Sequence, residues 1–287
     1  LGMIKAACWA DIDNDGKNEL IITGEWMGIQ VFKYTNGKFN AIKTNLNALE
    51  GWWQSLAVTD INNDGKPDFI LGNLGENFSL KPSVTQPVKI FIGDFDDNGR
   101  TDKIITRTID GNDKPLFMKR EVQDELPVLK KENLHHAEYA TKTIKDLFTA
   151  EQLAKTTIKQ VNYSSSIIAI NKGNYEFEII KLPVQVQLSS VKAIACKDVN
   201  NDGYIDLLLG GNEFNFQPQL GRLDASPGWI LLNNHKNGFT VLTTKESGIN
   251  LSGMVRDIQP VHIKKEEAFI FLQNNEKPVL FRFNKNK

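Results

Sequence analysis

The sequence predicts an all-β protein of the β-propeller class with a small α-helical insertion. Three observations lead to this prediction: an acidic nine-residue loop occurs four times, an apolar run follows each copy, and β-prone residues precede it. The repeating unit is therefore strand, loop, strand, which is how a propeller blade begins. The 287 residues contain roughly four to five blades of this kind.

The clearest copy of the loop extends from Asp198 to Asp206 and precedes the apolar run Leu207-Leu208-Leu209. Oxygen-bearing side chains stand at positions 1, 3, 5 and 9, and glycine stands at position 6, where the backbone must turn sharply. A hard cation that takes about six to eight oxygen ligands suits this pattern. We therefore expect Ca²⁺, with up to four ions bound by the four loops.

The predicted metal ligands are the residues at positions 1, 3, 5, 7 and 9 of each loop. They are Asp11, Asp13, Asp15, Lys17 and Glu19; Asp60, Asn62, Asp64, Lys66 and Asp68; Asp94, Asp96, Asn98, Arg100 and Asp102; and Asp198, Asn200, Asp202, Tyr204 and Asp206. Such residues also gather in metal-free turns, but four copies with the same offsets favour a metal loop. Each asparagine among the ligands removes one charge and should weaken its site.

The EF-hand is the competing interpretation of these loops. Its loop of about twelve residues begins in the same way but ends in a bidentate Glu, and a helix flanks it on each side. The corresponding twelfth residues of this chain are Ile22, Leu71, Ile105 and Leu209. The missing Glu and the strand-like runs that follow each loop exclude the EF-hand.

In chain order, the repeat units of a single propeller domain (1–287) are expected at about residues 3–50, 51–86, 87–185, 186–250 and 251–287. The first unit has four strand-like runs, with a tight turn at Asn36-Gly37, at residues 3–10, 19–23, 28–34 and 38–43. The second unit is short, because Asp60 and Asp94 begin their loops only 34 positions apart.

Helical periodicity appears between residues 119 and 161, where apolar residues recur at three- and four-residue spacings among Lys and Glu. Strand-like runs resume at residues 165–170 and 175–181, which we assign to the third unit. The helical insertion (119–161) is therefore expected between the second and third strands of that unit.

The final unit keeps its first strand but has no acidic loop and offers only three strands. A closed propeller needs a partner for that open edge, and the N-terminal segment often supplies it. Residues 3–10 are already assigned to the first unit. We therefore expect the closing strand to precede Leu1, so that the sequence is the C-terminal part of a larger propeller.

Composition and motifs exclude several functions. With a net charge of −1 and scattered Lys and Arg, the sequence predicts no nucleic-acid surface. It has no apolar run of about eighteen residues, so it predicts no membrane span. Cys8 and Cys196 are expected to be buried free thiols. No catalytic residue is predicted, because nucleophile elbow, phosphate loop and zinc-ligand spacing are all missing.

The loops resemble FG-GAP and VCBS repeats, the calcium-loop propeller units also found in integrin α chains. Longer strings are similar to a group of secreted or surface-attached Bacteroidota proteins that carry VCBS repeats and often an ASPIC/UnbV-type region. These strings are Gly51-Trp-Trp-Gln-Ser55, Gly72-Asn-Leu-Gly-Glu-Asn77, Pro87 with Asp94-Phe-Asp96, Leu126-Pro127, Tyr139-Ala140 with Thr143-Ile144, and Gly211-Asn212 with Gly221-Arg222-Leu223-Asp224-Ala225-Ser226.

The resemblance covers about residues 6–258. It implies a seven-bladed propeller with Ca²⁺ in its loops. It also implies an exported protein at the cell surface or outer membrane of a Gram-negative bacterium, or alternatively a periplasmic or secreted one. It implies no reaction.

Ligand binding is expected on the face opposite the acidic loops, because the other loops of a propeller lie there. Residues placed on that face by this rule are Trp26, Trp52, Trp53, Asn73, Asn77, Asn212, Glu213, Arg222 and Asp224, together with the helical insertion. Aromatic, amide and charged groups suit sugar rings or a protein partner. The structural alternative is that the Gly-Asn pairs form turns, that Trp52 and Trp53 pack between blades, and that Arg222 pairs with Asp224.

Two functions remain open from the sequence. The first is a calcium-stabilised binding or scaffolding module for an outer-membrane protein complex or a glycan. The alternative is a carbohydrate-active enzyme, a polysaccharide lyase or hydrolase, with a carboxylate pair drawn from Glu76, Glu213 and Asp224. An enzyme should show a deep pocket with converging charged groups, whereas a scaffold should show a flat or helix-covered face.

Overall fold

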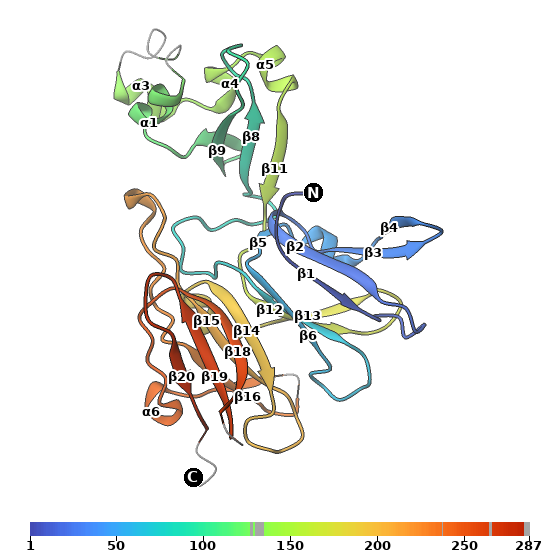
Figure 1. The fold of residues 1–287 in the computed structure, drawn as a ribbon. Helices are drawn as coiled ribbons and strands as arrows, with labels where there is room; N and C mark the ends of the chain where they lie inside the picture. The colour runs from blue at the N-terminus through green and yellow to red at the C-terminus, as the bar shows by residue number, and fades with distance from the viewer. Residues whose placement is uncertain (127–128, 130–134, 237, 264–265, 284–287) are drawn as a thin grey trace. The chain divides into compact units, whose positions relative to one another are not determined.

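The computed structural model describes every residue except 127–128, 130–134, 237, 264–265 and 284–287 (Figure 1). Parts of the expected helical insertion and of the last two repeat units therefore lie outside the described residues. The described chain forms five antiparallel sheets joined by turns and short helices. The all-β prediction is confirmed.

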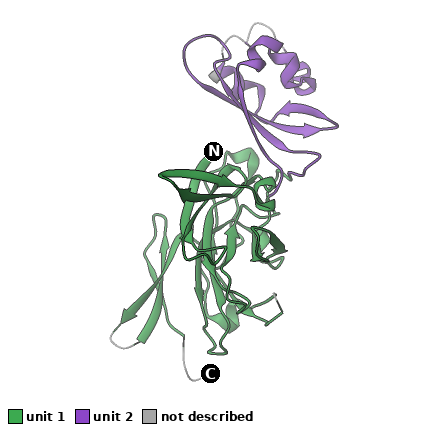
Figure 2. Cartoon of the chain, turned by 90° about the vertical axis from the view of Figure 1, so that its right-hand side faces the viewer, with its two compact units in different colours: residues 1–81, 164–287 green, residues 82–163 purple. Residues whose placement is uncertain are grey.

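The chain divides into two compact units (Figure 2). Unit 1 contains residues 1–81 and 164–287, and unit 2 contains residues 82–163. Unit 2 is thus an insertion within the sequence of unit 1.

Sheet 1, in unit 1, has the strand order that the sequence predicts for the first repeat. Its strands are β1 (Met3–Ala10), β2 (Glu19–Met27), β3 (Gln30–Thr35) and β4 (Lys38–Ile42), with β5 (Gly51–Trp52) paired to the end of β2. The turn between β3 and β4 has positive φ at both Asn36 and Gly37, which a tight hairpin turn of this kind requires.

Sheet 2 differs from the expected repeat units. It is formed by β6 (Ser55–Thr59), β7 (Asp68–Gly72), β12 (Ile167–Asn171) and β13 (Phe177–Lys181). The assignment of the last two runs to a third unit spanning 87–185 is wrong, because Ile167 pairs with Leu71 and Ala169 pairs with Phe69. The helices do lie between the second and third strands of one sheet, but that sheet is sheet 2.

The physical reason for this pairing is burial. Phe69, Ile70 and Leu71 are fully buried, as are Ile167 and Ile170. Two continuous apolar runs of this kind suit adjacent central strands covered on both faces, and each needs a hydrogen-bonding neighbour on both edges. A second unit that ended at residue 86 would leave β7 with one open edge.

Sheets 4 and 5 complete unit 1. Sheet 4 contains β14 (Val191–Lys197), β15 (Asp206–Gly211), β16 (Trp229–Asn233) and β17 (Phe239–Val241). Sheet 5 contains β18 (Val255–Ile263), β19 (Glu266–Gln273) and β20 (Val279–Phe281), so its described part has three strands, as predicted. The short helices of unit 1 are η1 (Asn45–Ala48), η2 (Val186–Leu188), η3 (Pro218–Leu220) and α6 (Thr244–Ser247).

The sheets of unit 1 pack in chain order through their first strands. Strand β6 lies beside both β1 and β14, and β14 lies beside β18. The approach is close: the hydroxyl of Ser55 donates to the carbonyl of Val191 at 2.9 Å, and a Cβ on Gly72 would lie 2.2 Å from that same oxygen. Apolar side chains of successive sheets fill the space between them, including Ile70, Leu207 and Leu209.

Unit 2 contains sheet 3 and the helices. Its strands, in sheet order, are β10 (Asn112–Pro115), β9 (Asp102–Ile109), β8 (Val88–Gly93) and β11 (Thr157–Val161). Its described helices are α1 (Lys119–Glu125), α3 (His136–Thr141), α4 (Ile144–Leu147) and α5 (Ala150–Ala154). The expected helical range of 119–161 is therefore too long, because residues 157–161 form the strand that covers the free edge of β8.

Unit 2 has its own hydrophobic core. Phe91 and Ile104 of the sheet, with Phe95 of the loop between β8 and β9, pack against Leu126 and Phe148 of the helical segment. The rings of Phe95 and Phe148 are 4.4 Å apart between centroids. This core explains why unit 2 is compact by itself.

Candidate metal loops

The four acidic loops have one backbone design. We number them loop 1 (residues 11–19), loop 2 (60–68), loop 3 (94–102) and loop 4 (198–206). In each loop the first Asp accepts hydrogen bonds from the backbone amides at positions 5 and 6, and the distances to position 6 are 2.8, 2.8, 2.7 and 2.9 Å in loop order. Position 4 has positive φ in every loop and is always Asn or Asp, the side chains that tolerate this conformation best after glycine.

The carboxylate at position 9 closes each loop. It accepts the backbone amide of position 2, at distances of 3.1, 3.0, 3.1 and 2.9 Å in loop order. The residues at position 2 are apolar, and Ile12, Ile61 and Phe95 are at most 2% exposed. The apolar residue at position 2 was not predicted as part of the loop, although it follows the first Asp in all four copies.

Position 7 contributes a backbone amide in every loop, and in loop 2 the side chain of Lys66 also lies 3.5 Å from the carboxylate of Asp64. The amides of Lys17, Lys66, Arg100 and Tyr204 donate to the side chain at position 5, at 2.9, 3.0, 2.8 and 2.9 Å. The residue type at this position is therefore free to vary, as it does across the four loops.

In loops 2 and 4 the carboxylate at position 9 is buried. Burial raises the pKa of Asp68 to about 6, and the negative charges of Asp64 and Asp60 add to this shift. Burial also raises the pKa of Asp206, again with contributions from the carboxylates of its own loop. A bound cation would offset this electrostatic cost.

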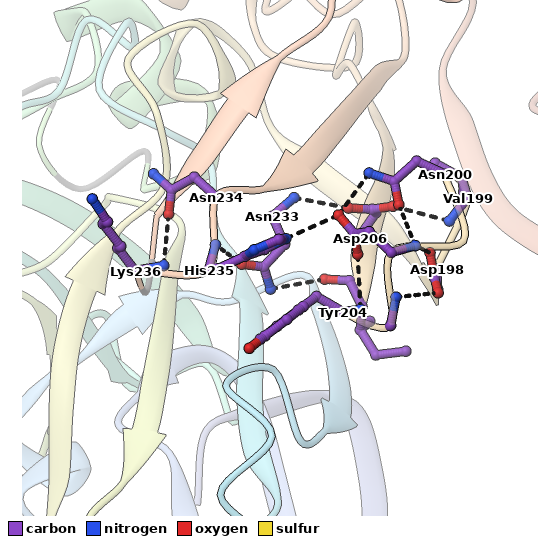
Figure 3. A network of polar contacts seen from close by, with 12 residues as sticks. Asp198, Val199, Asn200, Tyr204, Asp206, Asn233, Asn234, His235 and Lys236 are labelled. Carbon is purple, nitrogen blue, oxygen red and sulfur yellow. Dashed lines mark hydrogen bonds and ion pairs between the residues drawn. The ribbon is translucent and has the colours of Figure 1, made fainter. Parts of the chain in front are cut away.

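An asparagine at the end of the third strand connects neighbouring loops. In sheet 4 the amide of Asn233 donates to Asp206 at 2.8 Å (Figure 3). Its side chain donates to the carbonyl of Ile61 in loop 2 at 2.8 Å. In sheet 2 Asn171 repeats this arrangement, with its amide on Asp68 at 2.7 Å and its side chain on the carbonyl of Ile12 at 2.9 Å. The sequence analysis missed both residues.

Loop 4 carries an additional aromatic contact. The ring of His235 stacks on Tyr204 with centroids 4.0 Å apart, and its Nε2 lies 2.9 Å from a carboxylate oxygen of Asp202 (Figure 3). The hydrogen bond from His235 holds the pKa of Asp202 below its usual range. His235 was not among the predicted ligands.

Loop 3, in unit 2, brings three carboxylates together. Ligand atoms of Asp94, Asp96 and Asp102 lie within 4.8 Å of one another, so they could hold a metal ion. Within the described part of the chain, Oδ1 of Asp96 is buried without a hydrogen-bond partner. A cation among these oxygens would supply that partner, so this donor set fits a metal ion.

Loop 1 also brings three carboxylates together, but a lysine lies among them. Ligand atoms of Asp11, Asp13 and Asp15 are within 4.8 Å of one another. The Nζ atom of Lys33, on β3, lies 2.5 Å from Asp13, 2.7 Å from Asp15 and 3.3 Å from Glu19. The hydroxyl of Tyr175 donates to the same oxygen of Asp13. The donor set of loop 1 thus already has a positive charge at its centre.

Five of the nine residues predicted to form a ligand face are buried. Trp26, Trp52, Trp53, Asn73 and Asn212 are at most 7% exposed. Trp52 packs edge-on against both Trp26 and Phe78. The side-chain amide of Asn212 is hydrogen-bonded at both its oxygen and its nitrogen. The oxygen accepts from the hydroxyl of Ser189 at 2.8 Å, and the nitrogen donates to the carbonyl of Ser226 at 2.9 Å. For these five residues the ligand-face prediction is wrong, because their side chains complete the packing between segments of unit 1.

The other four predicted face residues lie nearer the surface. Asn77 donates to the carbonyl of Leu188 at 3.3 Å, and the guanidinium of Arg222 lies 4.1 Å above the ring of Phe214. Asp224 is exposed. Glu213 differs from these three, because its carboxylate forms ion pairs with Lys192 at 2.5 Å and with Arg256 at 3.6 Å.

Two of the three carboxylates considered for catalysis, Glu76 and Glu213, form ion pairs with lysines. Burial alone would raise the pKa of Glu213, but the hydrogen bond and charge of Lys192 outweigh it and hold that pKa below its usual range. Hydrogen bonds from Lys181 and Ser165, at 2.6 and 2.5 Å, hold the pKa of Glu76 low in the same way. A general acid needs a raised pKa, so neither group is prepared for that task.

A groove of about 390 Å³ lies along β14, β18 and β19. Its walls combine apolar side chains, with Ile194, Ile258 and Phe269 among them, and polar groups. Its charged residues, Lys197 and Glu267, pair with each other at 2.8 Å. The groove therefore lacks the converging charged groups that the enzyme hypothesis requires.

Within the described residues, none of the helices combines the length and the apolar character that crossing a membrane requires.

Comparison with known proteins gives one family. No curated protein matches the sequence. The matched segment begins at the first Asp of loop 1, contains loop 2 and ends within β7, so it covers two of the four acidic loops. Residues 11–71 of this chain match the model of the FG-GAP-like repeat.

Proposed function

We propose that this chain is a calcium-stabilised β-propeller segment that acts as a binding or scaffolding module. Three observations support the propeller: the FG-GAP-like repeat at residues 11–71, the four-stranded antiparallel sheets, and the packing of successive sheets through their first strands. We infer that sheets 1, 2, 4 and 5 are consecutive blades of a seven-bladed ring.

The observation that carries the role of calcium is the geometry shared by loops 2, 3 and 4. Each presents oxygen ligands at positions 1, 3, 5 and 9 on a turn that is already fixed by its own hydrogen bonds. Bound Ca²⁺ supplies the positive charge that the clustered carboxylates need. Because the unfolded chain has no such cluster, binding stabilises the folded state only.

The chain's own residues transmit this stabilisation. Asp68 and Asp206 connect the loop to the third strand through Asn171 and Asn233, and these asparagines reach the loop of the preceding sheet. A cation that fixes one loop therefore also fixes the junction between two sheets. Loops that serve in this way leave binding to other surfaces of the molecule.

We propose a protein complex or a glycan of the outer membrane as the partner. The resemblance of several strings to surface-attached Bacteroidota proteins supports an exported location at the cell surface or outer membrane. Scaffolding is favoured over catalysis because Glu76 and Glu213 are each neutralised by a lysine. The test is affinity isolation of the tagged protein from native outer membranes. A stoichiometric co-purifying complex supports the proposal, and isolation of the protein alone, with turnover of a polysaccharide, overturns it.

Removal of calcium tests the structural part of the proposal. At a free Ca²⁺ concentration about 100 times the dissociation constant, each occupied site stabilises the fold by about 2.7 kcal/mol. Adding EDTA should therefore lower the melting temperature by many degrees, and elemental analysis of the purified protein should find calcium. Unchanged melting in EDTA together with absence of bound calcium would contradict the proposal.

A further inference from the structure

We propose that Lys33 replaces calcium in loop 1, so that this loop is held by a cation of the chain itself while loops 2, 3 and 4 bind Ca²⁺. The inference rests on the proposed function for those three loops. It narrows the expectation of up to four ions to three, because one of the four acidic loops has an internal counter-ion.

The contacts of Lys33 are those of a bound cation. Its ammonium reaches Asp13, Asp15 and Glu19, which occupy positions 3, 5 and 9 of loop 1. The ammonium donates a hydrogen bond to Asp13, and it forms ion pairs with Asp15 at 2.7 Å and with Glu19 at 3.3 Å. The Lys33 side chain is only 19% exposed, and the side chain of Glu19 is fully buried, which limits screening by solvent.

The position of Lys33 in the sheet is what brings it to the loop. The residue at position 10 of the loop pairs with Phe32 in sheet 1, Ala169 in sheet 2 and Leu231 in sheet 4. The next residue of the third strand therefore lies beside position 9. That residue is Lys33 in sheet 1, whereas it is Ile170 in sheet 2 and Leu232 in sheet 4.

Sheet 3 places no equivalent residue beside its loop. Its third strand pairs with the far end of β9, from Pro115 opposite Thr106 to Asn112 opposite Ile109. Position 10 of loop 3 is Lys103, which pairs with β8 instead. Among the described residues of the four sheets that carry an acidic loop, sheet 1 is thus the one whose third strand directs a lysine into the loop.

Tyr175 adds a second contact from outside the loop. It lies in the turn between β12 and β13 of sheet 2, donates to Asp13, and has its oxygen 3.4 Å from Nζ of Lys33. Burial, followed by the hydrogen bond to Asp13, raises the pKa of Tyr175 to about 12. Loop 1 is thus connected to sheet 2 through Asp13, Tyr175 and Lys33 without a metal ion.

Calcium and Lys33 require the same oxygens. A Ca²⁺ ion binds its ligands at about 2.3–2.6 Å, and it cannot do so while an ammonium occupies hydrogen-bonding distance from three of those ligands. Binding would first have to expel Lys33 and leave its charge beside the ion. Loop 1 should therefore have a much lower calcium affinity than loops 2, 3 and 4.

The first experiment counts bound Ca²⁺ by isothermal titration calorimetry and native mass spectrometry, starting from calcium-free protein. Lys33→Met removes the ammonium and keeps an unbranched side chain, so the variant should bind one more equivalent of Ca²⁺ than the wild type. Lys172→Met is the matched control, because this exposed lysine pairs with Glu178 at 3.0 Å and contacts no loop ligand. The control should bind the same number of ions as the wild type.

The second experiment needs no change at Lys33. Asp15 and Asp64 both occupy position 5 and accept the amide of position 7, at 2.9 and 3.0 Å. Asp64→Ala should lose one equivalent of Ca²⁺, whereas Asp15→Ala should lose none. If Lys33→Met does not fold, this pair of variants still decides whether loop 1 binds Ca²⁺.

Two results overturn the inference: loss of one equivalent in Asp15→Ala, or an unchanged count in a folded Lys33→Met protein. Failure of the proposed function gives a different result, because the wild type would then bind no Ca²⁺ and Asp64→Ala would have none to lose. In that case the gain or absence of an ion in Lys33→Met still decides whether Lys33 excludes calcium from loop 1.

Discussion

Loop 1 and loop 2 share the hydrogen bonds that form an acidic turn, yet their carboxylates have different neighbours. In both loops the first Asp accepts the amide of the glycine at 2.8 Å. In loop 1 the carboxylate at position 9 lies 3.3 Å from the ammonium of Lys33. In loop 2 the equivalent Asp68 is buried next to Ile170, and its pKa is raised to about 6.

The difference shows that two parts of the sequence control two properties of such a loop. The nine residues of the loop determine its backbone, because Asp, Asn and Gly at fixed positions satisfy the turn locally. The charge balance depends on the third strand, which in sheet 2 lies about a hundred residues further along the chain. A loop sequence alone therefore identifies a possible site but does not establish that a metal ion occupies it.

The largest expected effect comes from Lys33→Met in calcium-free buffer. The carboxylates of Asp13, Asp15 and Glu19 would lose their counter-ion, so the melting temperature should fall by several degrees. Added Ca²⁺ should restore it, because the emptied loop then resembles loop 2. Thermal unfolding followed by circular dichroism, with and without EDTA, measures both changes. Equal melting of variant and wild type in EDTA would show that Lys33 does not stabilise loop 1.

The asparagines that join neighbouring loops give the next effect. Asn233→Ala removes the side-chain donor to the carbonyls of Ile61 and Ile205 and should cost about 1–3 kcal/mol of unfolding free energy. Tyr34 occupies the equivalent place in sheet 1 and is 53% exposed, so Tyr34→Ala should cost less. Urea unfolding of both variants makes the comparison. A larger loss for Tyr34→Ala would mean that the asparagine contacts contribute little.

A smaller effect on the free energy of unfolding is expected from pH, through the titration of Asp68 in loop 2. The folded-state pKa of Asp68 is about 6, whereas the ordinary value is 3.8. The calcium-free folded protein therefore gains stability from a bound proton below about pH 4 and loses it as the pH rises through about 6. Allowing for solvent screening, the loss is about 1–2 kcal/mol.

Urea unfolding of calcium-free protein, prepared before the titration and kept in calcium-free buffer, tests this sign at about pH 4.5 and about pH 7, which lie on either side of the titration. Asp68→Asn has no proton to lose, so its stability should fall less over this range than that of the wild type. If the wild type and the variant show the same pH dependence, Asp68 does not titrate as its burial indicates.

The smallest effect is expected for Lys172→Met. This lysine is on the surface and forms an exposed pair with Glu178. Exposed pairs contribute little, so the melting temperature should change by less than about 2 °C in the presence or absence of calcium. A change as large as that of Lys33→Met would show that any surface lysine near this loop stabilises it, and the comparison between loops 1 and 2 would lose its basis.

The sequence predicted the local parts of this structure well. The strands of sheet 1 and the turn at Asn36-Gly37 follow from alternation and turn chemistry over a few residues. The acidic loops could be recognised because their determinants lie within nine residues. The sequence also indicated that sheet 5 has three strands.

The sequence could not predict contacts between distant segments. The pairing of β7 with β12 depends on which apolar run reaches the open edge of β7, and periodicity does not contain that information. The burial of Trp52 follows from Phe78 and Trp26, whose proximity only the fold establishes. Lys33 looks like an ordinary strand residue until the register places it beside Glu19.

The insertion of unit 2 determines the order in which sheet 2 can be made during synthesis. Strand β7 is translated about 95 residues before β12, its partner, which at about 5–20 residues per second is a delay of roughly 5–20 s. During that time the apolar residues of β7 lack their neighbour. Unit 2 has its own core and can fold in this interval. Its folding brings its two ends together, since Val88 near its start pairs with Val161 near its end. An early-folding insertion would thereby shorten the loop that sheet 2 must close.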